Sequence, residues 1–144
     1  MSNMKKVTMG IILAGAMLTA FGSAVAGDKH KVVIQVSSAD AATQKIALNN
    51  AVNVQKDLGM DNVDIEIVAY GPGLSLLTAK SEESPRVKSL AMQNITFSAC
   101  GNTMKKVAKK TGKEPKLTEG VKVVSAGVIR IMELQEGGYS YIRP

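Results

Sequence analysis

The stretch KVVIQVSSADAATQKIALNNAVNVQKDLG, residues 31–59, decides the fold class. Its opening, Lys31–Val36, is a β-branched run of almost continuous apolar character, which is typical of a strand covered on both faces. After a break of two serines, apolar residues recur at helical spacing from residue 39 to Leu58, and Gly59 follows as a C-terminal cap. A buried strand followed by a helix is the unit from which parallel α/β sheets are built.

The remaining residues repeat this alternation. The spacing predicts an apolar side for the first helix that includes Ile46, Leu48 and Leu58, and a polar side that includes Gln44. Further strands are expected at Val63–Tyr70, Ile95–Ala99, Val121–Val124 and Tyr139–Ile142, and further helices at Leu74–Leu77, from Pro85, at Thr103–Thr111 and at Val128–Gln135. Alternation at the start of the second strand predicts one partly exposed face. The order predicts a three-layer α/β/α domain with a mostly parallel five-stranded sheet, but it does not determine which strands are neighbours.

The N-terminus has the three parts of a secretory signal peptide. Lys5 and Lys6 precede an uncharged, largely apolar run over residues 7–21, and Ala24 and Ala26 lie where a small-x-small cleavage site would be. An uncleaved membrane anchor is the alternative. We expect residues 1–26 to be removed, residues 27–144 to form one domain, and the mature protein to be periplasmic or secreted without membrane attachment.

Composition excludes several classes of function. Residues 27–144 contain 16 basic and 12 acidic side chains, a formal charge of +4, and the chain has no Trp and only 3% aromatic residues. These numbers do not favour nucleic acid binding, which uses stacking aromatics. A single His and a single Cys cannot complete an ordinary zinc site, a Cys–His catalytic pair is not expected because His30 precedes the first strand, and serine hydrolase chemistry lacks its base. We expect no metal and no cofactor.

Ligands of open parallel sheets bind at the carboxyl ends of the strands. The loops expected there are residues 37–38, 71–73, 100–102 and 125–127, all rich in small residues, and the lone Cys100 belongs to this set. A helix N-terminus stabilises a thiolate, and Lys105 and Lys106 would add to that field. Cys100 is therefore a reactive thiol, a buried inert side chain, or a partner in an intermolecular disulfide. The sequence Gly71-Pro72-Gly73 is a plain turn or a cradle of amides for an anion.

Two other groups of residues have both a structural and a functional interpretation. Six lysines lie within residues 105–116, and such a cluster either docks an acidic partner or a membrane surface or is simply a solvated helix face. Met92, Met104 and Met132 fit apolar helix sides, so we expect them in the core rather than as copper ligands.

Five stretches of the sequence together indicate a family resemblance: Lys31–Val36, Tyr70–Leu74, Phe97–Met104, Gly127–Arg130 and the closing Leu134–Pro144. In their order and spacing the sequence resembles the DsrE/DsrF-like family of sulfur-relay proteins, over essentially all of residues 27–144. The resemblance implies a DsrE-like α/β/α fold, flavodoxin-like in its general plan, that assembles into a trimer or hexamer.

For function, the resemblance implies that Cys100 matches the position that carries sulfur as a persulfide in active members. We therefore expect an exported sulfur carrier or sulfurtransferase that exchanges sulfane sulfur with a thiol-bearing donor or acceptor protein. Amides around Gly71, Gly73, Gly101 and Asn102 are the expected substrate-binding groups. The alternative is a non-enzymatic oligomeric or small-ligand-binding protein in which Cys100 is inert.

Overall fold

A computed structural model describes residues 27–144; the predicted signal peptide, residues 1–26, lies outside these residues. In chain order the elements are β1 (His30–Val36), α1 (Ala41–Leu58), η1 (Met60–Asn62), β2 (Val63–Ala69), η2 (Gly71–Leu77), α2 (Ser84–Ala91), β3 (Ile95–Cys100), α3 (Gly101–Thr111), β4 (Val121–Val124), α4 (Gly127–Glu136) and β5 (Ser140–Ile142), where η marks a 3₁₀ helix. The predicted alternation of strands and helices is confirmed, with shifts of one or two residues at several ends. The largest difference is at η2, which begins three residues earlier than predicted and includes the turn expected at residues 71–73, and η1 was not predicted.

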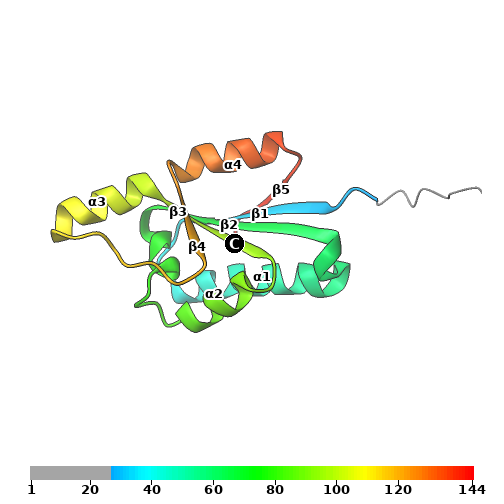
Figure 1. Cartoon of the computed structure of the whole chain (residues 1–144), viewed down its shortest axis with the longest axis horizontal. Coiled ribbons are helices and arrows are strands. Elements are labelled where there is room, and N and C mark those ends of the chain that lie inside the picture. Colours follow the sequence, from blue (N-terminus) through cyan, green and yellow to red (C-terminus); the bar gives the residue numbers. More distant parts are fainter. Residues whose placement is uncertain (1–26) are drawn as a thin grey trace, which may run out of the picture.

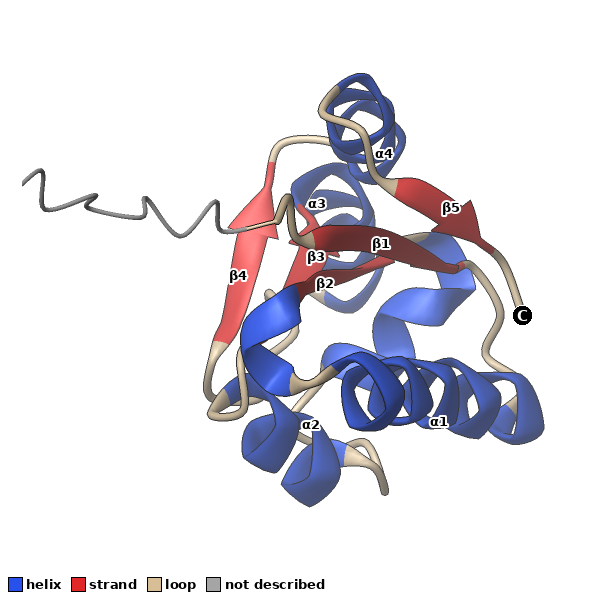
Figure 2. Cartoon of the chain, turned by 90° about the vertical axis from the view of Figure 1, so that its right-hand side faces the viewer, coloured by secondary structure: helices blue, strands red, loops and turns tan. Residues whose placement is uncertain are grey.

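The five strands form one sheet in the order β4-β3-β2-β1-β5, and every neighbouring pair is parallel. From β1 the chain proceeds through β2 and β3 to β4 at one edge, and then returns across the sheet to β5 beside β1. Because crossovers between parallel strands are right-handed, this reversal of direction moves the connecting helix to the other face. Accordingly, α1 and α2 cover one face of the sheet and α4 covers the other (Figure 1, Figure 2).

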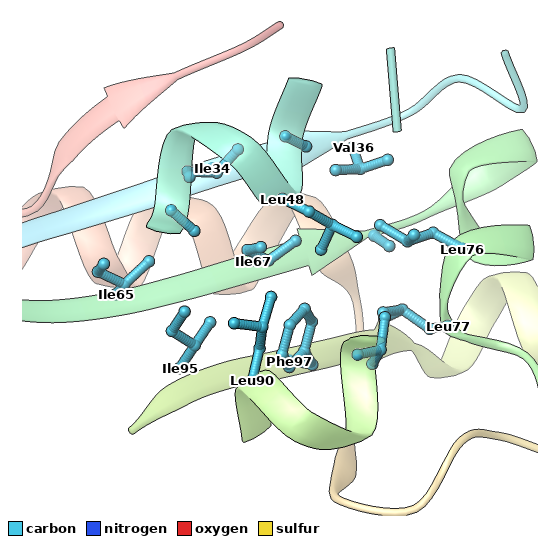
Figure 3. Close-up of a cluster of buried hydrophobic side chains, with 14 of the residues drawn as sticks. Ile34, Val36, Leu48, Ile65, Ile67, Leu76, Leu77, Leu90, Ile95 and Phe97 are labelled. Carbon is cyan, nitrogen blue, oxygen red and sulfur yellow. The ribbon is translucent and has the colours of Figure 1, made fainter. Parts of the chain in front are cut away.

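The two faces of the sheet are packed to different depths. On the side of α1 and α2, nineteen buried side chains form one hydrophobic cluster, which is centred on Phe97, Ile67 and Leu48 (Figure 3). On the side of α4 the cluster of buried apolar residues contains only Val33, Val68, Ile131 and Leu134. Hydrophobic stabilisation scales with the apolar area buried, so the first face contributes most of the stability of the fold.

Helix α1 is defined by its two ends. Asp40 caps the N-terminus, where its carboxylate accepts from the amide of Thr43 at 2.7 Å and from its hydroxyl at 2.9 Å. Gly59 follows the last turn with a φ of 89°, a conformation that glycine adopts without steric cost.

The predicted sides of α1 were partly wrong. Ile46 is 48% exposed, whereas Gln44 and Gln55 are buried. Both glutamine amides have partners outside the helix: Gln44 donates to the carbonyl of Ser38 and to the hydroxyl of Ser75, and Gln55 donates to the carbonyl of Gln93. A buried polar group costs little when it is hydrogen-bonded, and α1 is therefore rotated relative to its apolar pattern.

The three methionines that were predicted to lie in the core differ in their burial. Met104 is buried in the main cluster as predicted, but Met92 is 73% exposed at the end of α2 and Met132 is 50% exposed on α4, so the prediction was wrong for these two. Met92 is the cap residue after α2, and Met132 lies on the side of α4 opposite its buried Ile131 and Leu134. Among residues 27–144, none of the helices combines the length and apolarity needed to cross a bilayer.

Candidate functional site

Cys100 is the last residue of β3 and the N-cap residue of α3. The turn predicted over residues 100–102 is absent, because the helix starts at Gly101 and Asn102 belongs to its first turn. This abrupt junction depends on a close approach to the neighbouring strand end. A Cβ atom on Gly101 would lie 2.9 Å from the carbonyl oxygen of Val124, so a larger residue would displace α3 from β4.

The thiol of Cys100 is almost enclosed, yet its surroundings favour the charged form. The residue is 5% exposed. Burial by itself raises the pKa of the thiol, but the hydroxyl of Thr103 and the backbone amides of Gly127, Thr103 and Asn102 act in the opposite direction, and the net pKa is lowered. A buried cysteine in an apolar pocket would show the opposite shift.

These amides come from the first turns of two different helices. Asn102 and Thr103 begin α3, and Gly127 is the first residue of α4. The start of α3 is tied to the loop that leads into α4, since the amide of Asn102 donates to the carbonyl of Ser125 at 3.2 Å. Because each helix N-terminus carries partial positive charge, their convergence on one sulfur stabilises a thiolate more than a single helix would.

Thr103 connects the thiol to the loop after β2. Its hydroxyl oxygen accepts from the amide of Gly71 at 2.9 Å, which leaves the hydroxyl hydrogen free to point toward the sulfur. Gly71 thus acts on Cys100 through Thr103. The amide of Gly73 instead donates to the carbonyl of Tyr70 at 3.1 Å.

The remaining predicted site residues are placed as follows. Gly73 is a packing position, because a Cβ there would lie 2.1 Å from the carbonyl oxygen of Val36. The side chain of Asn102 is exposed. Lys105 and Lys106 are also exposed, and neither is among the groups that shift the pKa of Cys100. In the part of the chain that the structure describes, no three His, Cys, Asp or Glu side chains are grouped as a metal site would require.

A cluster of polar and charged side chains around the buried Glu66 lies on the same face of the sheet as Cys100 and was not predicted. Side chains alternate along β3, so Ser98 and Cys100 face α4 while Ala99 faces the main core. Ser98 donates to the carboxylate of Glu66 at 2.6 Å. Arg130 of α4 binds the same carboxylate through two nitrogens, at 2.9 and 2.8 Å, and this pairing raises the pKa of the guanidinium further.

This cluster fixes the start of α4 relative to the sheet. Arg130 lies one turn after Gly127, whose amide faces the thiol, and Glu66 belongs to the central strand β2. The alternation at the start of β2 had indicated a partly exposed face, which holds for Asp64 with its side chain 44% exposed but not for Glu66, which is only 4% exposed. The available signal was Glu66 between two isoleucines in a largely apolar strand, together with a lone arginine in the last helix.

Comparisons with known proteins agree with this architecture. The model of the DsrE/DsrF-like family matches residues 30–144. Among solved structures, the chain is similar to a protein of unknown function, MTH1491 from Methanobacterium thermoautotrophicum, with 37% identity and a TM-score of 0.72 over 81% of this chain and 100% of that one. The ychN protein from E. coli has the same fold, with 12% identity and a TM-score of 0.62 over 81% of this chain and 99% of that one. No curated protein matches the sequence.

Proposed function

The chain belongs to the DsrE/DsrF-like family, and on that premise we propose that it is a sulfur-handling protein that carries sulfane sulfur as a persulfide on Cys100. The observation that carries the proposal is the environment of this thiol. Three backbone amides from two helix starts and one hydroxyl lower its pKa despite burial. The thiolate is the form of cysteine that attacks sulfur, and these groups are positioned to hold its charge.

The transfer is a pair of exchange reactions without net oxidation. The thiolate of Cys100 attacks the terminal sulfur of a donor persulfide, R–S–SH; the S–S bond of the donor breaks, a new S–S bond forms on Cys100, and the donor leaves as the thiolate R–S⁻. In the second step an acceptor thiolate attacks the terminal sulfur on Cys100 and regenerates the Cys100 thiolate. The amides that stabilise the resting thiolate also make Cys100 a better leaving group in this step.

Intact-mass analysis after treatment with glutathione persulfide tests the proposal. We expect the native protein to gain one sulfur atom, to lose it on reduction, and to release it to an added thiol. Cys100→Ser should gain none, which makes this variant the matched control because it keeps the size of the side chain. A native protein that gains no sulfur, while the urea-unfolded protein does, would contradict the proposal.

The 5% exposure of Cys100 favours one other candidate, a non-enzymatic oligomeric or small-ligand-binding protein in which the thiol is inert. Titration with an aromatic disulfide reagent separates the two. A relay cysteine should react in the native protein, without unfolding, because its thiolate is stabilised at neutral pH. An inert cysteine should react only after unfolding.

The proposal also includes export and assembly. The leader-like residues 1–26 support a periplasmic or secreted location, which cell fractionation with detection of the mature N-terminus would test. A homo-oligomer, trimer or hexamer, is supported by the exposed apolar side of α4, where Val128, Ile129 and Met132 are each about half exposed. Mass measurement of the native protein would decide this, and a monomer at micromolar concentration would contradict it.

A further inference from the structure

The positive charge of the domain is concentrated in one short segment. Residues 105–116 contain six lysines and one glutamate, a formal charge of +5, whereas all of residues 27–144 contain 16 basic and 12 acidic side chains, a charge of +4. The rest of the domain therefore has a formal charge of −1. We call residues 105–116 the lysine segment. Its six lysines are Lys105, Lys106, Lys109, Lys110, Lys113 and Lys116.

These charges are not compensated within the described residues. All six lysines are exposed, and none takes part in the ion pairs found within residues 27–144, which involve Lys29, Lys88, Arg86 and Arg130. Helix α3 contains no acidic residue, so it gains no internal ion pairs from its lysines. A concentration of unpaired like charge costs self-repulsion, and an acidic partner relieves that cost.

The lysine segment also borders a largely apolar groove of about 530 Å³. The groove is lined by Thr78, Lys80, Val107, Thr111, Lys113, Glu114, Pro115 and Lys116. Lys113 and Lys116 of this segment, together with Lys80, thus outnumber the single acidic residue of the lining, Glu114, and lie beside Val107 and Pro115 in one concave surface. This combination fits a peptide that presents both acidic and apolar side chains, whereas a flat bilayer surface does not enter a groove, and the lining offers no aromatic ring for stacking nucleobases.

The walls of the groove are held together before any partner binds. The amide of Ala79 donates to the carbonyl of Lys116 at 2.8 Å, and the amide of Thr118 donates to the carbonyl of Leu77 at 2.9 Å. The hydroxyl of Thr118 also donates to the carbonyl of Thr78. A groove that is already formed binds its ligand without a cost of ordering its own backbone.

The groove and Cys100 lie at opposite ends of the same helix. In Figure 1, α3 runs away from the sheet, and the loop that follows it returns beneath it. The 11 residues of α3 make it about 16 Å long, a span that about five extended residues cover. A chain that docks in the groove and continues along α3 therefore reaches the start of the helix, where Cys100 is the N-cap residue, within a few residues.

We propose that the lysine segment and its groove form the docking surface for an acidic segment of the protein that exchanges sulfur with Cys100. The inference rests on the proposed function for the identity of the partner. The docking itself is a separate property and is tested separately. The exchanging cysteine of the partner is placed about five residues from its acidic segment.

The probe is a fluorescein-labelled peptide in which Glu and Leu alternate, with one cysteine persulfide about five residues from that tract. Fluorescence anisotropy measures its affinity for the full mature chain. The test variant is Lys109→Gln/Lys113→Gln/Lys116→Gln, which spares the first turn of α3. The matched control removes three lysines elsewhere that form no ion pair, Lys45→Gln/Lys56→Gln/Lys122→Gln, and circular dichroism confirms folding of both.

We expect the test variant to bind the peptide at least tenfold more weakly, because it loses three ion pairs with the peptide, each of which contributes modestly to affinity. The control variant should bind within about twofold of the original chain, because its three lysines lie outside the lysine segment. Replacing Glu by Gln in the peptide, or raising the salt concentration, should have the same effect as the test variant. If both variants lost affinity equally, the peptide would be attracted only to the net charge of the protein, and the proposal would be overturned. Equally tight binding of phosphatidylserine vesicles or of a single-stranded oligonucleotide would overturn it as well.

The same proteins distinguish failure of docking from failure of the proposed function. Small-molecule persulfide should load Cys100 equally in the original chain and in the test variant, whereas the persulfide peptide should load the original chain faster. If the small molecule loads Cys100 but the peptide shows no preference for the lysine segment, only the docking proposal fails. If the peptide binds but neither donor loads Cys100, only the sulfur-carrier function fails.

Discussion

Replacing Arg130 with Met should destabilise the domain by about 3 kcal/mol, because the carboxylate of Glu66 then remains buried without its counter-charge. The side chain of Glu66 is 5% exposed, and its two oxygens accept from Arg130 and Ser98. Breaking a fully buried pair costs about 3–5 kcal/mol; the lower end applies here because the side chain of Arg130 is 35% exposed and water reaches one end of the pair. Adding Glu66→Gln to this variant should recover about 1–2 kcal/mol, since it removes the buried charge and keeps an acceptor for Ser98.

Urea unfolding at one fixed protein concentration measures these differences, because assembly would make apparent stability depend on concentration. Arg86→Met is the matched control: its side chain is 34% exposed and lies 3.8 Å from Glu83, a comparable arginine without the buried bidentate pair. We expect the control to lose no more than about 1 kcal/mol. If the double variant proves less stable than Arg130→Met alone, Glu66 is not an uncompensated charge and the reasoning is wrong.

Three further predictions concern the thiol and the core. Thr103→Val should raise the pKa of Cys100 by removing the hydroxyl hydrogen bond, whereas Thr103→Ser should keep it low; the pH dependence of alkylation by iodoacetamide measures both, and identical profiles would exclude this role. Gly73→Ala should cost more than about 2 kcal/mol of unfolding free energy or prevent folding, since its Cβ would lie 2.1 Å from the carbonyl oxygen of Val36; a variant as stable as the original chain would refute the close packing. Phe97→Ala should lower the free energy of unfolding by about 3–5 kcal/mol, whereas Met92→Ala, at a position that is 73% exposed, should lower it by less than about 0.5 kcal/mol. Thermal unfolding measures both.

Local pattern was sufficient for the elements of this fold but not for their arrangement. The β-branched run at Lys31–Val36 and the helix closed by Gly59 are decided by neighbouring residues, so the sequence predicted them well. Strand order depends on pairings between distant segments, and nothing in the residues of β5 indicates that it lies beside β1 rather than β4. The rotation of α1 has the same origin, because the carbonyl partner of Gln55 is Gln93.

For the candidate site, position could be predicted and environment could not. The small residues around Cys100 indicated a strand end, and the structure places the residue there. The amide of Gly127 comes from a helix whose closeness to Cys100 depends on the path of the chain across the sheet. The cluster of Glu66, Ser98 and Arg130 was missed because its members are separated by at least 32 residues in sequence, and each alone reads as an ordinary polar residue.

The uneven packing of the two faces reconciles a nearly enclosed thiol with a role in exchange. Cys100 points to the α4 side of the sheet, where four buried apolar residues form the cluster, rather than to the side with nineteen. Local opening draws on the least stabilised part of a structure, so α4 can separate from the sheet at a smaller cost than α1. The pair between Arg130 and Glu66 opposes that separation and holds the amide of Gly127 on the sulfur in the closed state. Of the four groups that stabilise the thiolate, α4 supplies the amide of Gly127 and α3 supplies the other three, so separation of α4 from the sheet should open the side that Cys100 faces and raise the pKa of its thiol.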